Sequence, residues 1–519
     1  MDKKLLSLPI GIQTFEKLRS MGKLYVDKTE RLMQLVDDST RVFLSRPRRF
    51  GKSLTLSTLD AMFSGKVELF RGLAAETWVA QQARQPSAVL NFDMSAMDTG
   101  DATQLRQSLL ESLDRLSRQF HIQLHSKTIN GMLQDLILDM FNRDGPVTVL
   151  IDEYDKPILD NIGNLEKAKE MRMTLHSFYT VLKSCDKYLR FVMLTGISKF
   201  SKMGVFSALN NLRDISMSRQ YGDIAGYTQE ELERDFSGWI DDSALKMGMV
   251  RRDLLQRMRD YYDGFCFDGK VRLYNPFSIL NFFSEQEFSN YWYESGSPSF
   301  IVAYMRQHGV NEPETYRHIR VTADFVGSQE IERARPESFL YQSGYLTVES
   351  KEEQQLTLDY PNREVLNSIS RMYLENVYRV EDYAPIGTDL WRALKTGDIT
   401  EAVRLYNTAL AGIPYEDFKR QEEALYKAVF IALLRGAGVE VFGEVQTSRG
   451  RPDVLVLFKN RIVVLEFKLA RRESEIHRLR REGLNQIEES GYTAPFDNDR
   501  RPVTSAVIVI NGEKHEATL

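Results

Sequence analysis

Cysteine and histidine are scarce in this chain, and their scarcity narrows the chemistry that the protein can use. The 519 residues include two cysteines, Cys185 and Cys266, which lie far apart and lack metal-ligand spacing. The seven histidines are spread along the chain. We therefore expect a protein of the reducing cytoplasm without a disulfide framework. Its metal ions should be held by carboxylates rather than by transition-metal ligands.

Long apolar runs and a strong charge imbalance are also missing. No run of about 18 apolar residues is present, so no membrane span is predicted, and the first apolar run is too short for a signal peptide. The net charge of −5 argues against a surface that coats nucleic acid, but it allows a local basic channel. With 42% hydrophobic residues, the chain is expected to form about three globular domains.

Short apolar segments alternate with amphipathic ones in the first part of the chain. The amphipathic segments at 103–120 and 129–142 are predicted helices. This alternation predicts an α/β fold with a parallel sheet covered by helices on both faces. The predicted strands are 41–45, 88–93, 147–152, 190–196 and 213–218.

Later changes of pattern divide the chain into four predicted segments. They are an α/β domain (1–225), a helical lid with a winged helix as a variant (226–300), a mostly helical linker with a small hairpin (301–410) and a second α/β domain (411–519). In the last segment a helix is followed by three short strands, a basic helix and a final strand.

The stretch VFLSRPRRFGKSLTLSTL, residues 42–59, resembles a phosphate-binding loop between a strand and a helix. Gly51-Lys52-Ser53 match the end of the GxxxxGK[ST] pattern, but Arg46 replaces its opening glycine. Amides near the helix start would hold phosphates, Lys52 would reach the β- and γ-phosphates, and Ser53 would bind Mg²⁺. The predicted nucleotide contacts are Arg48, Arg49, Phe50, Gly51, Lys52, Ser53 and Leu54.

Two downstream stretches support a nucleotide site. In VTVLIDEYDKP, a buried strand delivers Asp152 to the Mg²⁺ shell, and Glu153 would orient or deprotonate the attacking water. In MLTGISKFS, Thr195 or Ser198 would place a polar sensor beside the γ-phosphate. Arg213 is either an arginine finger or sensor, or a solvated arginine at a strand edge.

These stretches resemble a family of bacterial and archaeal AAA-like ATPases that carry RPRRFGKS in place of the usual loop. LYVDKTERL (24–32), YDGFCF, LYNPFSIL and NYWYESGSPSF (290–300) match the same family. The resemblance spans about residues 5–300 and implies an additional-strand P-loop ATPase that uses ATP and Mg²⁺. The roles of Arg46, Arg48 and Arg49 stay open among three alternatives. The arginines could brace the loop, contact phosphates, or pair with acidic groups of the lid or of a neighbouring subunit.

A second site is predicted in FGEVQTSRGRPDVLVLFKNRIVVLEFKLA. Residues two apart in a strand share a face, so Glu466 and Lys468 point the same way while Phe467 points into the core. A short turn brings Asp453 beside Glu466. Two carboxylates and a lysine on one sheet face suit a Mg²⁺ site for phosphodiester hydrolysis, with Lys468 positioning water or stabilising charge. A lone E-x-K pattern is also an ordinary exposed ion pair.

The order of these elements resembles the PD-(D/E)xK nuclease superfamily. Its subgroup fused to such ATPases reads E-x-x-Y, E, GR-x-D, E-F-K and Q-x-x-x-x-Y. This chain has Glu423/Tyr426, Glu444, Gly450 to Asp453, Glu466 to Lys468, and Gln486 with Tyr492, where the tyrosine stands one residue later than in the pattern. By resemblance, Asp453 and Glu466 ligate Mg²⁺, with Mn²⁺ as a substitute. Glu423 supports a second ion or a water, and Gln486 orients Lys468 or the phosphate. Glu444 is a ligand or a partner of Arg451.

The basic segment KLARRESEIHRLRREGLNQ is either a phosphate-backbone footprint or a solvated helix. Together the patterns predict an ATP-controlled, metal-dependent nuclease that acts on nucleic acid, with DNA favoured over RNA, and that forms homo-oligomers. The resemblance alone implies a role in prokaryotic defence. Two alternatives stay open: a nucleotide-gated protein that grips nucleic acid without cutting it, and an oligomeric scaffold ATPase with a vestigial nuclease fold.

Overall fold

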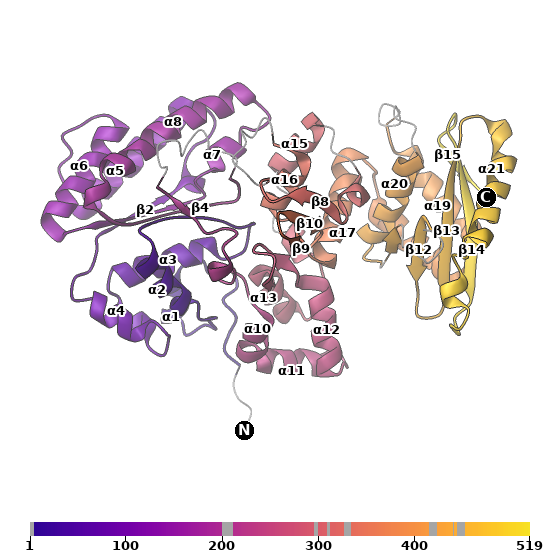
Figure 1. Ribbon diagram of the computed structural model, residues 1–519, viewed down its shortest axis with the longest axis horizontal. Coiled ribbons are helices and arrows are strands. Elements are labelled where there is room, and N and C mark those ends of the chain that lie inside the picture. Colours follow the sequence, from indigo (N-terminus) through magenta and orange to yellow (C-terminus); the bar gives the residue numbers. More distant parts are fainter. Residues whose placement is uncertain are drawn as a thin grey trace. The chain divides into compact units, whose positions relative to one another are not determined.

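The computed structural model describes residues 5–199, 211–294, 299–308, 312–325, 334–414, 423–439, 441–443 and 452–519 (Figure 1). The chain divides into two compact units. Unit 1 comprises Met1–Gly309 and His318–Glu364, and unit 2 comprises Val310–Arg317 and Val365–Leu519. The four-segment division expected from the sequence is finer than this one, and its boundaries stay a prediction.

Unit 1 is built on a five-stranded parallel sheet, which confirms the predicted α/β class. The strand order is β2-β3-β4-β1-β5. Every neighbouring pair is parallel, and β4 lies between β1 and β3, as expected for an additional-strand P-loop sheet. The strands are β1 (Arg41–Ser45), β2 (Val89–Asp93), β3 (Val147–Asp152), β4 (Leu189–Gly196) and β5 (Arg213–Asp214).

Helices cover both faces of this sheet, with α5, α6 and α8 on one side and α1 to α4 on the other (Figure 1). Alternation along β1 explains both layers, because Phe43 packs in one core while Val42 and Leu44 pack in the other. The helices are α1 (Phe15–Ser20), α2 (Thr29–Asp38), α3 (Lys52–Phe63), α4 (Glu76–Gln82), α5 (Ala102–Phe120), α6 (Ile129–Asp144), α7 (Lys156–Leu159) and α8 (Leu165–Ser184).

The rest of unit 1 combines a helical subdomain, formed by the helices between residues 229 and 294, with two small antiparallel sheets. A capping box of Thr228 and Glu231 starts α10, and Asn275 caps α13 through the amides of the first helical turn. One sheet is the ribbon β6-β7, and the other has the order β8-β10-β9 and contains the predicted hairpin. The elements are α10 (Gln229–Asp235), α11 (Ser237–Lys246), α12 (Arg251–Tyr262), β6 (Phe265–Cys266), β7 (Arg272–Leu273), α13 (Pro276–Glu285), α14 (Tyr291–Glu294), α15 (Ser299–His308), β8 (Ile319–Thr322), α16 (Pro336–Ser343), β9 (Thr347–Glu352) and β10 (Gln355–Asp359).

Unit 2 places a second sheet, of order β11-β12-β13-β14-β15, beside helices. β12 and β13 are antiparallel, whereas β13 and β14 are parallel and are connected through α21, which packs on both. The strands are β11 (Val441–Gly443), β12 (Val454–Leu457), β13 (Ile462–Ala470), β14 (Val503–Asn511) and β15 (Glu516–Thr518). The helices are α18 (Tyr383–Thr396), α19 (Ile399–Ala411), α20 (Glu423–Gly436) and α21 (Ile476–Glu489), and α17 (Arg363–Met372) begins at the end of unit 1.

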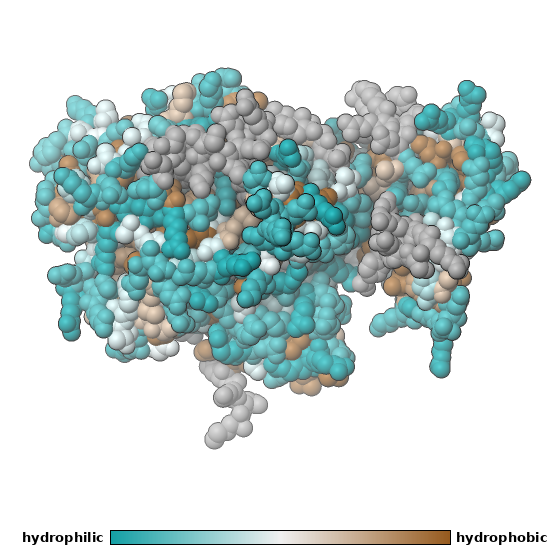
Figure 2. Space-filling model, viewed as in Figure 1, coloured by the Kyte–Doolittle hydropathy of each residue, from teal (hydrophilic) through white to brown (hydrophobic). Residues whose placement is uncertain are grey.

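The surface seen in Figure 2 is mainly hydrophilic, and its apolar residues are scattered in small groups. The most exposed large apolar side chains, Leu245 and Val250, are 81% and 67% exposed. Within the described ranges, no helix is long and apolar enough to cross a membrane.

Candidate functional sites

A cavity of about 440 Å³ opens in unit 1 beside the loop that joins β1 to α3. All seven residues predicted from Arg48 to Leu54 line it, together with the predicted Asp152 and Glu153. The other walls come from the N-terminal segment, including Gln13, and from the helical subdomain, including Phe277. The structure thus gathers these nine predicted residues around one space, whereas Thr195 is not among the residues that line it.

The start of α3 shows why Gly51 is needed there. Gly51 caps the helix with a φ of 91°, a left-handed conformation that strains other residues. The helix begins at Lys52, whose ammonium donates to the carbonyls of Arg46 and Pro47 at 3.1 and 3.2 Å. The first amides of α3 are unpaired within the helix, which suits phosphate binding.

Asp152 joins three elements at the end of the sheet. Ser53 of α3 donates its hydroxyl to Asp152 Oδ2 at 2.5 Å, and Thr195 of β4 donates to Oδ1. Glu153 follows with a φ of 52° and donates its amide to Asp152 Oδ1 at 3.0 Å. Four residues predicted from three separate stretches therefore meet at one edge of the sheet, where their oxygen atoms suit a Mg²⁺-dependent nucleotide site.

Asp155 was not anticipated from the sequence, although it stands in the same IDEYD stretch. It is 1% exposed, and burial raises the pKa of Asp155 to about 6. Its carboxylate accepts hydrogen bonds from the amides of Ile197 and Ser198, at 3.1 and 2.6 Å, and from the Ser198 hydroxyl at 2.7 Å. Asp155 thus fixes the turn after Thr195. Of the two predicted sensors, Thr195 contacts Asp152, and Ser198 is held by Asp155.

The arginine that replaces the opening glycine points away from the cavity. Arg46 is 1% exposed and donates to the carbonyls of Ser45 and Ser216 at 3.0 and 2.7 Å, with longer contacts to the carbonyls of Tyr221 and Gly222. Its guanidinium stacks over Phe267 at 4.2 Å, and burial lowers the pKa of Arg46 to about 10. Arg46 therefore braces the loop against the residues around it.

The other arginines differ from Arg46. Arg48 and Arg49 line the cavity, and Arg49 stacks over Phe277 at 4.9 Å. Arg213 donates to Ser39 at 2.7 Å and lies 4.0 Å from Asp38, and it is not among the cavity-lining residues. This placement favours the solvated strand-edge interpretation of Arg213 within this chain.

The second predicted site lies in unit 2, on β12 and β13. Val454 pairs with Leu465, so Asp453 and Glu466 stand at neighbouring positions of the two strands. Asp453 Oδ2 accepts a 2.8 Å hydrogen bond from the Phe467 amide, and the Phe467 ring is fully buried. The predicted alternation along β13 is therefore observed.

Glu466 has an unusually high pKa for a glutamate. It is 2% exposed, and burial, reinforced by Asp453, raises the pKa of Glu466 to about 7 even though Lys468 counteracts the shift. Lys468 Nζ contacts Glu466 Oε1 at 2.8 Å, and Glu466 Oε2 is buried without a hydrogen-bond partner among the described residues. A buried carboxylate oxygen without a donor, beside a second carboxylate, fits a divalent cation.

The helix α20 contributes the remaining charged groups. Glu423 accepts a 3.1 Å hydrogen bond from the Leu469 amide, and burial raises the pKa of Glu423. Lys427, one turn later on the same face, lies 3.1 Å from Asp453 Oδ1. Sequence reasoning missed Lys427, but its i+4 spacing from Glu423 was a usable signal.

Two further predictions for this site concern Gln486 and the segment that contains Glu444. Gln486 of α21 donates to the Tyr492 hydroxyl at 3.0 Å, and its expected contact with Lys468 is not among the hydrogen bonds of the described residues. Glu444, Gly450 and Arg451 lie outside the described residues.

Two known families match this chain, one in each of the regions that contain the candidate sites. A family described as a predicted AAA-ATPase matches residues 9–206, and the PD-(D/E)XK nuclease superfamily matches residues 421–517. Together these domains point to an enzyme with ATPase and nuclease activity, which implies the use of a nucleotide and of a divalent metal ion.

Individual proteins are also similar to this chain. A protein of Azotobacter chroococcum mcd 1, described as an uncharacterized protein in the vnfD 5′ region, is 34% identical over 508 residues, which cover 96% of this chain and 95% of the relative. Among solved structures, the Aeropyrum pernix ORC1 protein in complex with DNA is 10% identical, and the match covers 68% of this chain and 94% of that one. Its TM-score of 0.24 is too low to bear on fold or function.

Replacing Arg46 tests its bracing role. Arg46→Ala removes a buried guanidinium and leaves carbonyl groups without their donor, so we expect the free energy of unfolding of unit 1 to fall by about 3 kcal/mol. Arg49→Ala, at an exposed position, should cost less than about 1 kcal/mol. Chemical denaturation followed by circular dichroism measures both, and equal losses would contradict the assignment.

The raised pKa of Glu466 predicts a pH-dependent metal affinity. With a pKa of about 7, about a tenth of Glu466 is ionised at pH 6 and about nine tenths at pH 8. Because a cation needs the ionised form, Mn²⁺ should bind this site roughly tenfold more tightly at pH 8. Calorimetric titration with Mn²⁺ compares the wild type with Glu466→Gln, and the Mn²⁺ binding seen only in the wild type is assigned to this site. If its affinity is the same at pH 6 and pH 8, the assignment is wrong.

Proposed function

Because this chain belongs to the family that joins a predicted AAA-ATPase domain to a carboxyl-terminal PD-(D/E)XK nuclease domain, we propose that it is a divalent-metal-dependent nuclease controlled by ATP. The observation that carries the nuclease half is the pairing of Asp453 with Glu466 across β12 and β13, with Lys468 beside them. The Ser53–Asp152–Thr195 contacts carry the ATPase half.

In the ATPase domain, each residue has a role that follows from its place. The amides of residues 48–53 hold phosphate oxygens, and Lys52 neutralises charge on the β- and γ-phosphates. Ser53 and Asp152 would hold Mg²⁺, which supplies electrostatic stabilisation of the transferring phosphate. Glu153 orients or deprotonates the attacking water, and Thr195 places its hydroxyl beside Asp152.

In the nuclease domain, Asp453 and Glu466 would hold Mg²⁺ or Mn²⁺, and the ion would supply polarisation of the scissile phosphate and activation of a water. Lys468 would stabilise the charge that develops on the phosphate. Glu423 would support a second ion or a water. Lys427 keeps Asp453 in place through its 3.1 Å contact.

The substrate that fits these groups is the phosphodiester backbone, and we favour DNA over RNA. Arg471 and Arg472, which follow Lys468 closely in the chain, and Arg481 of α21 are exposed. They supply the sequence-independent attraction that a phosphate backbone needs. Arg478, in contrast, is paired with Glu475 and Glu482.

The control by ATP rests on the presence of two complete sites in one chain. We further propose that the protein acts as a homo-oligomer in the prokaryotic cytoplasm, where the buried thiols of Cys185 and Cys266 stay reduced, and that it serves in defence against foreign nucleic acid. The defence role is supported only by family resemblance.

Cleavage assays test the nuclease proposal directly. Wild-type protein is incubated with supercoiled, linear and single-stranded DNA and with RNA, in Mg²⁺ or Mn²⁺, with and without ATP. Asp453→Asn should abolish cutting because it removes a metal ligand. Lys468→Met should leave metal binding intact and slow cutting by about 100-fold.

Two controls make the assay decisive. Thermal unfolding shows whether each variant is folded, and Lys459→Met changes a lysine in the β12–β13 turn, away from the carboxylates. Cutting that survives Asp453→Asn would disprove the site. A wild type that binds nucleic acid but cuts none of the substrates would support the nucleotide-gated, non-cleaving alternative.

A further inference from the structure

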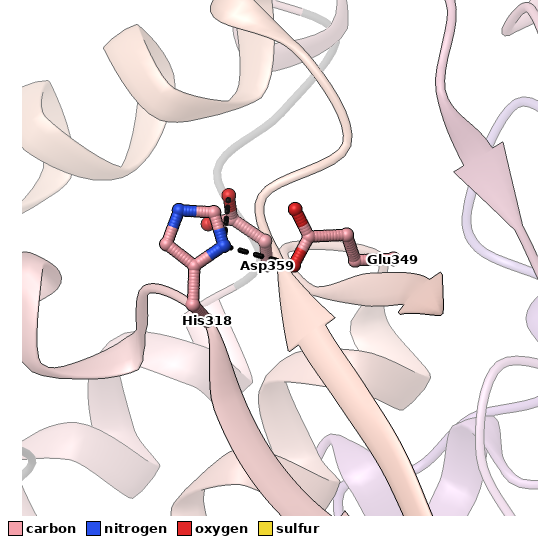
Figure 3. Close-up of side chains that lie close together, drawn as sticks. All are labelled: His318, Glu349 and Asp359. Atoms are coloured by element: carbon pink, nitrogen blue, oxygen red, sulfur yellow. Dashed lines mark hydrogen bonds and ion pairs between the residues drawn. The ribbon is translucent and has the colours of Figure 1, made fainter. Parts of the chain in front are cut away.

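Three chemically compatible side chains meet on the small antiparallel sheet of unit 1. His318 immediately precedes β8, Glu349 lies in β9 and Asp359 ends β10. Figure 3 shows the imidazole ring facing both carboxylates. His318 Nδ1 lies 2.8 Å from Glu349 Oε2 and 3.6 Å from Asp359 Oδ2, and one ligand atom from each residue lies within 4.8 Å of the others. Neither predicted site contains these residues.

Two backbone irregularities aim these side chains at one point. The pairing of β9 with β10 passes from Ser350↔Thr357 to Val348↔Leu358, so Glu349 is the extra residue of a β-bulge. Bulges redirect a side chain at some cost in sheet regularity. His318 has a φ of 50°, which is also uncommon for a residue with a side chain. Regular strands would not bring these groups together.

The separations suit a small divalent cation. For metal–ligand bonds of about 2.1 Å in a tetrahedral site, two ligand atoms lie about 3.4 Å apart. The observed 2.8 and 3.6 Å fall on either side of that value, and all three ligand atoms lie within 4.8 Å of one another, so small side-chain movements would bring them around one ion. One imidazole with two carboxylates favours Zn²⁺ or a similar transition ion, because Mg²⁺ prefers oxygen ligands alone.

Exposure favours the same interpretation. The Asp359 side chain is 9% exposed, while those of His318 and Glu349 are 59% and 37% exposed. The buried carboxylate anchors the ion, and the open side admits it together with water ligands.

We propose that His318, Glu349 and Asp359 form a binding site for a divalent transition-metal ion, with Zn²⁺ as the leading candidate. The site lies close in the sequence to two of the three points at which the chain passes between the two units, Arg317/His318 and Glu364/Val365. His318 is the first residue after one crossing, and Asp359 ends the strand that leads to the other. An ion bound here would fix both strand ends, so its role is a structural clamp next to the crossings.

Metal binding to the full-length protein tests this proposal. Equilibrium dialysis against Zn²⁺ with metal analysis gives the stoichiometry, and Co²⁺ substitution gives a visible spectrum that depends on the ligands. His318→Gln and Glu349→Gln should each weaken the binding of one Zn²⁺ equivalent by at least about tenfold, because each removes a direct ligand. The wild type, but not these variants, should gain thermal stability with Zn²⁺.

Matched controls separate this site from the others. His125→Gln alters an exposed histidine elsewhere, and Asp453→Asn alters the nuclease carboxylates, so both should keep the Zn²⁺ equivalent and the Co²⁺ spectrum. Glu349 is exposed enough for its amide variant to fold even if His318→Gln does not. Equal Zn²⁺ stoichiometry and affinity in the wild type and Glu349→Gln would overturn the proposal. So would a wild type that binds no Zn²⁺, which would leave the cluster as a histidine ion pair.

Discussion

The hydrogen bonds that Asp152 accepts from Ser53 and Thr195 are the constraint on which the ATPase half of this protein depends. They tie the start of α3 and the ends of β3 and β4 to one carboxylate. A buried parallel sheet places the carboxyl ends of its strands at a common edge, and there Asp152 accepts from both hydroxyl groups while it lines the cavity. Asp155 likewise holds the turn after β4, because its carboxylate accepts hydrogen bonds from the amides of Ile197 and Ser198.

A comparable constraint shapes the second unit. The Phe467 amide holds Asp453, and the Leu469 amide holds Glu423, so backbone groups of β13 position two of the three carboxylates. Glu466 is left with a buried oxygen that lacks a donor among the described residues. The pKa of Glu466 is raised because its carboxylate is buried and lies beside Asp453.

Sequence patterns predicted the parts whose signals are local. The apolar runs of β1, β3 and β4, the Gly51-Lys52-Ser53 loop end and the alternation along β13 are each readable within a few residues. Arg46 was harder, because its carbonyl partners, such as Ser216, lie 170 residues away in the chain. The His318 cluster was missed for the same reason: its side chains come from β9, from β10 and from the residue before β8, and their meeting depends on a β-bulge that has no local sequence signal.

Control of the nuclease site by the ATPase site can be tested by measuring the rate at which wild-type protein and Lys52→Ala cleave the same DNA in Mg²⁺, with and without ATP. We expect ATP to change the wild-type rate, and we expect Lys52→Ala to cleave at a rate that ATP does not change. Equal responses to ATP in both proteins, or wild-type cleavage that ignores ATP, would contradict this control.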